Sequence, residues 1–200
     1  MTAAAARRVL VDAIVIGASA GGVEALLALL PAIPPDYRGS VLVVLHLPRE
    51  RPSLLVDLFR PKCALAVREA EDKEPVAAGT IYFAPSDYHL LVDHGPVLAL
   101  SIDEPVNFSR PSIDVLFESA AEVYGSRLLG IILTGANDDG TVGLEAVARA
   151  GGRTCVQDPS TAHAPLMVES ALRRVRADHV LGLDGLIDLL RTVTAVTDPV

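Results

Sequence analysis

The sequence predicts an α/β fold: a doubly wound, mostly parallel sheet flanked by helices, with an added antiparallel β-hairpin. Short apolar runs that end in glycine or a polar residue alternate with longer amphipathic stretches, as parallel strands joined by crossover helices do. Residues 64–102 instead hold several short β-like runs separated by turn residues, which favours a hairpin there. With 200 residues, 50% of them hydrophobic, the chain can bury the core of one such domain.

The amino-terminal part of the chain supplies two strand–helix units. Residues 12–16 are expected to form a strand and residues 21–30 its helix. A second strand at residues 40–46 and a second helix at residues 52–59 follow. Prolines between these units mark the turns.

The remaining elements begin with the β-like region and then return to alternation. Three short strands are expected at residues 80–84, 88–92 and 97–102. Beyond them we expect a helix at 112–124, a strand at 127–133, a helix at 140–150, a strand at 153–156, and helices at 165–174 and 185–193.

Composition excludes several classes of function. The 25 acidic and 17 basic residues give a net charge of -8, which argues against a nucleic-acid partner, because such affinity depends on Lys and Arg neutralising phosphates. Cys63 and Cys155 lie far apart and outside any C-x-x-C spacing, so we expect neither a disulfide framework nor a zinc site. Because the sequence has no apolar run long enough for a membrane span and no signal-peptide core, we expect a cytoplasmic protein.

The first candidate for chemistry is Ser19, in the segment IVIGASAGGVEALLALL. It lies in a Gly17-x-Ser19-x-Gly21 turn between a buried strand and a helix, where small neighbours let the hydroxyl project beyond the sheet edge, as nucleophilic serines do. Two other interpretations stay open on this segment alone. The serine can simply cap the helix, or the turn can be a degenerate dinucleotide-binding loop.

Two further strand ends bring polar side chains to the same edge. The strand VLVVLH ends in His46, where a dinucleotide fold would carry an acid for the ribose. The segment GIILTGANDDGTVGL places Asp138 and Asp139 just before a helix, where either can accept the Nδ1 hydrogen of the histidine or cap the helix. The order Ser, His, Asp along the chain differs from that of α/β-hydrolases.

Six ordered blocks resemble the catalytic domain of the chemotaxis protein-glutamate methylesterases, the CheB type. They are IGASAGG (16–22), VLHLP (44–48), IYFAPSDYHL (81–90), RPSIDVLF (110–117), LTGANDDGTVG (133–143) and QDPSTAHAP (157–165). We therefore expect a catalytic domain at residues 12–197 after a short tail at residues 1–11. The receiver domain that precedes this domain in well-known members is absent from the sequence, which leaves three possibilities: regulation by a separate protein, a constitutively open domain, or residues cut from a longer chain.

The resemblance implies hydrolysis of γ-methyl-glutamyl esters on the cytoplasmic helices of methyl-accepting chemoreceptors, giving glutamate and methanol, with no metal or cofactor. Some relatives also deamidate glutamine. It implies that Ser19 is the nucleophile, His46 the general base and acid, and Asp139 the orienting acid, with Asp138 a cap or surface residue.

Secondary roles follow from the same resemblance. Backbone N–H groups of the turn at Ala20 and Gly21, and of the loop at residues 135–137 around Ala136, are candidate oxyanion donors. Arg110 either shapes the substrate cleft or makes a surface ion pair. Leu45, Ala20 and Ala136 stand where the family often has Gln, Thr and Met, which bears on substrate preference and rate.

Two functions of other classes remain as alternatives to hydrolysis. One is a non-catalytic signalling or scaffold module of the same fold that binds receptors or kinases. The other is a nucleotide-binding domain, which Ser19 and His46 disfavour at the positions of a glycine and a ribose-binding acid.

Overall fold

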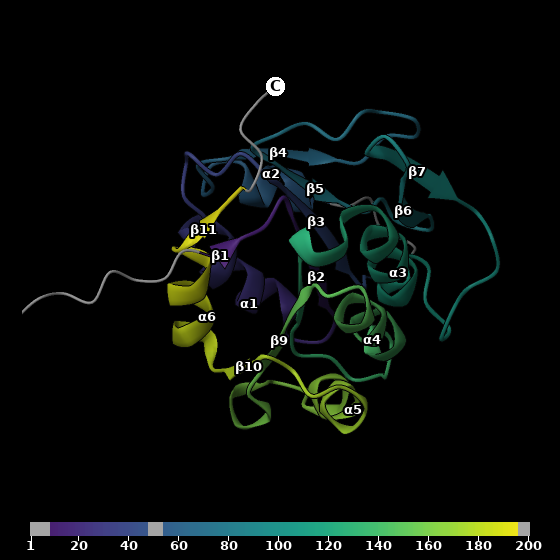
Figure 1. Ribbon diagram of the computed structural model, residues 1–200. Helices are drawn as coiled ribbons and strands as arrows, with labels where there is room; N and C mark the ends of the chain where they lie inside the picture. Colours follow the sequence, from purple (N-terminus) through teal and green to yellow (C-terminus); the bar gives the residue numbers. More distant parts are fainter. Residues whose placement is uncertain (1–8, 48–53, 196–200) are drawn as a thin grey trace, which may run out of the picture.

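A parallel sheet organises the chain in the computed structural model, which describes residues 9–47 and 54–195 (Figure 1). Its strands are β2 (Ala13–Ala18), β3 (Ser40–Leu45), β4 (Ala66–Glu69), β5 (Thr80–Phe83), β8 (Leu128–Ile132), β9 (Arg153–Gln157) and β10 (His179–Leu181). They lie in the order β10-β9-β8-β2-β3-β5-β4, and every neighbouring pair is parallel. The chain winds outward from β2 in both directions, first through β3 and later through β8. The carboxyl ends of β2 and β8 therefore form the crevice at which ligands bind in such sheets.

Helices cover both faces of this sheet (Figure 1). One face carries α1 (Gly22–Leu29), α2 (Leu55–Phe59) and α6 (Leu183–Leu190), and the other carries α3 (Ile113–Tyr124), α4 (Thr141–Arg149) and α5 (Leu166–Arg174). Among the described residues, three single 3-10 turns complete the helical segments: η1 (Leu30–Ala32), η2 (Gly125–Arg127) and η3 (Pro159–Thr161). Within residues 9–47 and 54–195, no helix combines the length and the apolar character that a membrane crossing requires.

Two small sheets flank the main one. The antiparallel hairpin of β6 (His89–Asp93) and β7 (Val97–Ser101) packs on α3, and β1 (Val9–Leu10) pairs in parallel with β11 (Val193–Thr194). These findings confirm the predicted α/β class, with a mostly parallel sheet and an added hairpin.

The central strand β2 is buried on both of its faces. All six residues of the strand are buried, with Ile14 and Ile16 in the core under α1 and α6, and Ala13 and Val15 in the core under α3 and α4. A strand covered on both faces is apolar at every position, as parallel strands commonly are. The apolar run that predicted the strand is therefore a consequence of burial on both faces.

The structure corrects several predicted elements. Residues 80–84 were grouped with the hairpin, but β5 pairs in parallel with β3 and β4, because both faces of its TIYF run are buried. The edge strand β4 was not predicted, since its AVRE sequence has only one buried residue, and neither were β10, β1 and β11. The helix predicted at 185–193 begins and ends earlier as α6. In the helix predicted at 52–59, the first two residues lie outside the described residues.

Gly17 sets how closely α3 approaches the central strand. A Cβ at this glycine would lie 2.4 Å from Cγ2 of Ile113, the first residue of α3, so only glycine permits the observed packing. The amino-terminal end of α3 is thereby held against the end of β2.

We expect Gly17→Ala to lower the free energy of unfolding by about 2 kcal/mol, the usual cost of overfilling a packed core. In an Ile113→Ala background the same change should cost less, because the colliding side chain is gone. Urea unfolding of the four proteins measures this coupling. An equal cost in both backgrounds would show that the contact with Ile113 is not the constraint.

Candidate active site

Ser19 occupies the turn between β2 and α1. Its N–H donates to Thr134 O at 3.0 Å, and Thr134 Oγ1 donates to Ala20 O at 2.8 Å, so the turn is fixed to the end of β8. Gly21 adopts the left-handed region at φ 77°, and a Cβ there would lie 2.5 Å from the Cβ of His163. Among the described residues, no hydrogen bond engages the Ser19 hydroxyl, which faces a cleft.

His46 follows β3 directly and reaches across β2 toward the end of β8. Its backbone N–H donates to Ala18 O at 3.0 Å, and its ring Nε2 lies 2.9 Å from Asp139 Oδ2. The other ring nitrogen, Nδ1, lies 3.2 Å from Asn137 Nδ2. The amide NH2 group can only donate, so Nδ1 accepts and the ring proton resides on Nε2.

This geometry corrects one detail of the sequence analysis. The aspartate was expected to accept the Nδ1 hydrogen, but it accepts the Nε2 hydrogen of His46. The reason is distance: β3 and β8 are separated by β2, which puts them about 10 Å apart at the usual strand spacing. Nε2, the ring nitrogen farther from the backbone, is the one that reaches Asp139.

Asp139 comes just before α4 in the sequence, but its carboxylate lies at the amino-terminal end of α3. It has no solvent exposure. Its Oδ2 accepts the N–H of Ile113 at 2.6 Å, and its Oδ1 accepts the Ser112 hydroxyl at 2.7 Å and the N–H of Asp114 at 3.1 Å. Burial alone would raise the pKa of this carboxyl, but the hydrogen bonds from His46, Ile113 and Ser112 outweigh it and lower the pKa below its ordinary value. The carboxylate therefore stays ionised beside the imidazole.

The cleft in front of these groups has a volume of about 210 Å³. Its described lining residues are Ser19, His46, Leu47, Phe108, Ser109, Arg110, Pro111 and Asn137. Ser19 and His46, 27 positions apart in the sequence, thus share one cleft, and Asp139 holds the far side of the imidazole.

Comparison with known proteins shows which family the chain belongs to. The family model described as CheB methylesterase matches residues 14–190. The chain belongs to the CheB methylesterase family. A relative from Leptospira interrogans serovar copenhageni, named a putative protein-glutamate methylesterase/protein-glutamine glutaminase, is 44% identical over 178 residues, which cover 89% of this chain and 92% of that protein.

Two other members of the family bear on the boundaries and the fold. A protein-glutamate methylesterase/protein-glutamine glutaminase 2 from Anaeromyxobacter dehalogenans is 40% identical over 96% of this chain, which spans 56% of that protein. The crystal structure of the Thermotoga maritima CheB methylesterase catalytic domain matches with a TM-score of 0.84 and 34% identity, covering 90% of this chain and all of that one. The resemblance noted in the sequence is confirmed.

Arg110 of this CheB-family domain lies at the cleft and also makes an ion pair. It lines the cleft, and its Nε and Nη2 donate to Asp87 Oδ1 at 3.0 and 2.8 Å. Its Nη1 donates to the carbonyls of Ile102 and Asp103 at 2.8 and 3.1 Å. The guanidinium therefore joins the loop that follows β7 to the turn that precedes β6.

The candidate oxyanion donors divide into two groups. Gly135 donates its N–H to Ala164 O at 2.9 Å, so this residue of the predicted loop is already engaged. The N–H groups of the other candidates donate to no acceptor in residues 9–47 and 54–195, which leaves four candidates: Ala20, Gly21, Ala136 and Asn137.

A second buried carboxylate lies next to Asp139. Asp114 accepts the N–H of Gly143 at 2.6 Å and the Asn107 amide at 2.8 Å, and the same amide donates to Asp139 Oδ1 at 3.3 Å. Burial and the nearby charge of Asp139 raise the pKa of Asp114 to about 6, against the lowering effect of its two hydrogen bonds. Asn107 thus bridges two carboxyl groups.

Sequence reasoning did not predict the side-chain contacts that support the triad candidates. Asn137, Asn107 and Ser112 all contact His46 or Asp139. Ser112 was placed at a helix start, but its hydroxyl bonds Asp139 in place of its own helix. Such contacts between distant segments leave no local pattern, although polar residues within the matched blocks were a usable signal.

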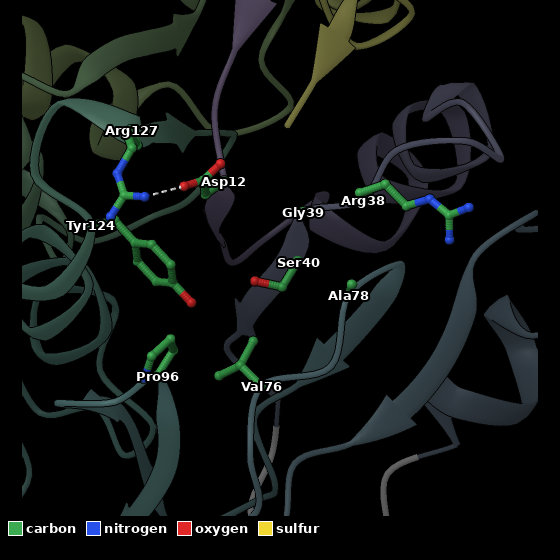
Figure 2. A pocket seen from close by; sticks show the side chains of 9 residues that line it. All are labelled: Asp12, Arg38, Gly39, Ser40, Val76, Ala78, Pro96, Tyr124 and Arg127. Carbon is green, nitrogen blue, oxygen red and sulfur yellow. Dashed lines mark hydrogen bonds and ion pairs between the residues drawn. The ribbon is translucent and has the colours of Figure 1, made fainter. Parts of the chain in front are cut away.

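A larger hollow, of about 240 Å³, lies at the amino ends of the strands, at the opposite end of the sheet from Ser19 (Figure 2). The ion pair of Arg127 with Asp12, at 2.6 Å, crosses one side, and the hydroxyls of Tyr124 and Ser40 point toward each other (Figure 2). No group there resembles a nucleophile with its base. Across residues 9–47 and 54–195, no cluster of three or more His, Cys, Asp or Glu side chains is arranged to hold a metal ion.

The raised pKa of Asp114 predicts a pH-dependent stability difference between the wild type and Asp114→Asn. The folded-state pKa of about 6 exceeds the ordinary value of 3.8, so the folded state holds the proton more tightly. The protonated carboxyl is favourable below pH 4, and this contribution is lost as pH rises through 6. Relative to Asp114→Asn, wild type should lose roughly 2 to 3 kcal/mol across that window. Urea unfolding at pH 4 and pH 7 measures it, and a pH-independent difference would contradict the prediction.

Proposed function

We propose that the protein is a protein-glutamate methylesterase in which Ser19 is the nucleophile, His46 the general base and acid, and Asp139 the orienting acid. The observation that carries the proposal is the convergence of these groups at adjoining strand ends, with His46 bonded to Asp139 at 2.9 Å and sharing a cleft with Ser19. Relatives that bear this activity in their names support the substrate class.

In the first half of the reaction, His46 Nδ1 removes the proton from Ser19 Oγ, which attacks the ester carbonyl. The Oγ–carbon bond forms, and the carbonyl oxygen becomes an oxyanion that the candidate backbone N–H groups can bind. Collapse breaks the bond to the methoxy oxygen, which takes the proton from Nδ1 and leaves as methanol.

In the second half, water replaces methanol in the cleft. Nδ1 accepts a proton from the water as its oxygen attacks the glutamyl-enzyme, and returns it to Ser19 Oγ as the glutamate is released. Asp139 keeps its charge throughout, because its hydrogen bonds hold its pKa low, and so stabilises the imidazolium at each step.

We further propose that the substrate glutamates lie on the cytoplasmic helices of chemoreceptors, which places the enzyme in the cytoplasm. The cleft opens beside Phe108, whose side chain is 101% exposed. Ile102, on the same loop, is 71% exposed. An apolar rim of this kind suits contact with a helix surface around the esterified side chain.

Glutamine deamidation is a second candidate activity of the same site. The relatives' names include protein-glutamine glutaminase. The chemistry requires the same groups, because an amide nitrogen leaving as ammonia takes its proton from Nδ1 as the methoxy oxygen does.

The decisive test is methanol release from methylated receptor cytoplasmic fragments. We expect Ser19→Ala, His46→Ala and Asp139→Asn each to reduce the rate by about ten-thousand-fold, because members of such a triad act as one unit. Ser109→Ala is the matched control and should retain most activity. Ser109 lines the same cleft, and within the described part of the chain its hydroxyl bonds only Asn107 O. Ammonia release from unmethylated fragments with glutamine at these sites tests deamidation in parallel.

Absence of release by folded wild-type protein from several receptors would favour the alternative of a non-catalytic signalling or scaffold module. A normal rate of methanol release by Ser19→Ala would exclude Ser19 as the nucleophile.

Phe108→Ala tests the proposed contact with a receptor helix. We expect KM for the receptor fragment to rise about ten-fold, the loss that follows when a buried aromatic contact is removed from an interface. Hydrolysis of a small soluble ester should be unchanged, and so should the melting temperature, because the side chain is fully exposed in the free protein. Unchanged receptor kinetics would show that the helix contacts other parts of the rim.

A further inference from the structure

Asn137 closes a ring of hydrogen bonds around the proposed base. Asp139 N–H donates to Asn137 Oδ1 at 3.3 Å, Asn137 Nδ2 donates to His46 Nδ1 at 3.2 Å, and His46 Nε2 donates to Asp139 Oδ2 at 2.9 Å. Each contacting atom of the ring acts either as a donor or as an acceptor, and none acts as both. The three side chains therefore fix one another's orientation.

The orientation of the Asn137 amide follows from its two partners. A backbone N–H can only donate, so the amide group facing Asp139 N must be the oxygen. The NH2 group is then left to face His46 Nδ1, which must accept. Turning the amide over would set two donors against each other at Asp139 and sacrifice the Nδ1 contact.

The ring has a direct chemical consequence. A neutral imidazole has one lone pair that can take a proton, here on Nδ1, and the Asn137 amide already engages it. The Ser19 hydroxyl is without a hydrogen bond among the described residues, although it lines the same cleft as His46 and Asn137. His46 is therefore in position to act as the base, but its lone pair is bonded to Asn137 and not to Ser19.

We propose that Asn137 is a positioning residue that engages His46 Nδ1 in the substrate-free enzyme and yields it to Ser19 when a substrate fills the cleft. The inference rests on the proposed function of Ser19 and His46. It extends that function by naming the residue that keeps the serine unactivated until a substrate side chain enters.

Displacement of Asn137 is required by the proton transfer itself. Once Nδ1 receives the Ser19 proton it becomes a donor, and the Asn137 NH2 group cannot remain opposite it without setting two donors together. The side chain is only partly buried and lies on the wall of the cleft, so an entering substrate can displace it. Small esters that leave the cleft partly empty displace it less well, which favours substrates that fill the site.

The experiment measures the reactivity of Ser19 toward methanesulfonyl fluoride, whose single methyl group makes it smaller than the methyl-glutamyl side chain of the substrate. Ser19 Oγ bonds to sulfur, the S–F bond breaks, fluoride leaves and His46 Nδ1 takes the proton. We expect Asn137→Ala to be labelled about five-fold faster than wild type, the equivalent of releasing one neutral hydrogen bond. Asp138→Ala is the matched control, exposed on the same loop, and should react at the wild-type rate.

The direction of the change separates two roles of Asn137. If Asn137 only held the ring in place for catalysis, its removal would slow labelling. An unchanged or slower rate in Asn137→Ala therefore overturns the proposal, and intact-protein mass spectrometry with peptide mapping confirms that Ser19 is the labelled residue.

Nitrogen NMR of the imidazole gives a second test that does not depend on activity. In wild type we expect Nε2 to be protonated and Nδ1 unprotonated, and Asn137→Ala should move the Nδ1 resonance downfield because it loses a donor. A proton on Nδ1 in the wild type would overturn the proposal directly. Should Ser19 prove unreactive in both the wild type and Asn137→Ala, the proposed function of Ser19 fails, while the NMR experiment still decides whether Asn137 engages the base.

Discussion

The site depends on one buried negative charge, the Asp139 carboxylate at the amino-terminal end of α3. An ion without solvent contact is costly unless its oxygens are fully bonded. Here the two backbone N–H groups of Ile113 and Asp114, the Ser112 hydroxyl and the His46 ring supply those bonds. The positive end of the 12-residue helix adds a favourable field at the same place. The carboxylate orients the imidazole because the helix first orients the carboxylate.

Because the Asp139 carboxylate depends on α3, the site requires several features of the fold at the same time. Helix α3 must begin where the carboxylate lies, and Gly17 permits its first residue to reach the end of β2. The loop before the helix carries Arg110, whose bonds to Asp87 and to the carbonyls of Ile102 and Asp103 keep that loop in place. A cleft wall and the support for the acid are thus parts of the same segment.

The sequence predicted the class of fold and the location of the main groups, because each rests on a local pattern. Apolar runs predicted the strands, and polar residues at their carboxyl ends indicated Ser19, His46 and the pair Asp138 and Asp139. The family resemblance then selected Asp139. What escaped prediction depends on contacts between distant segments. The edge strand β4 has one buried residue and so no apolar run, and β5 resembles a hairpin strand until its neighbours are known. Which ring nitrogen of His46 faces the acid depends on the order of strands, which the sequence does not state.

The position of Ser19 after β2 also bears on how the site responds to thermal fluctuations. This strand is fully buried and bonded on both sides, by β3 and β8, so we expect its amides to be among the last to exchange with solvent. The serine is attached to this strand, while the loop carrying Phe108 and Arg110 borders the same cleft from the surface. Partial opening of the surface loop would alter access to the cleft well before the attachment point of the nucleophile is lost.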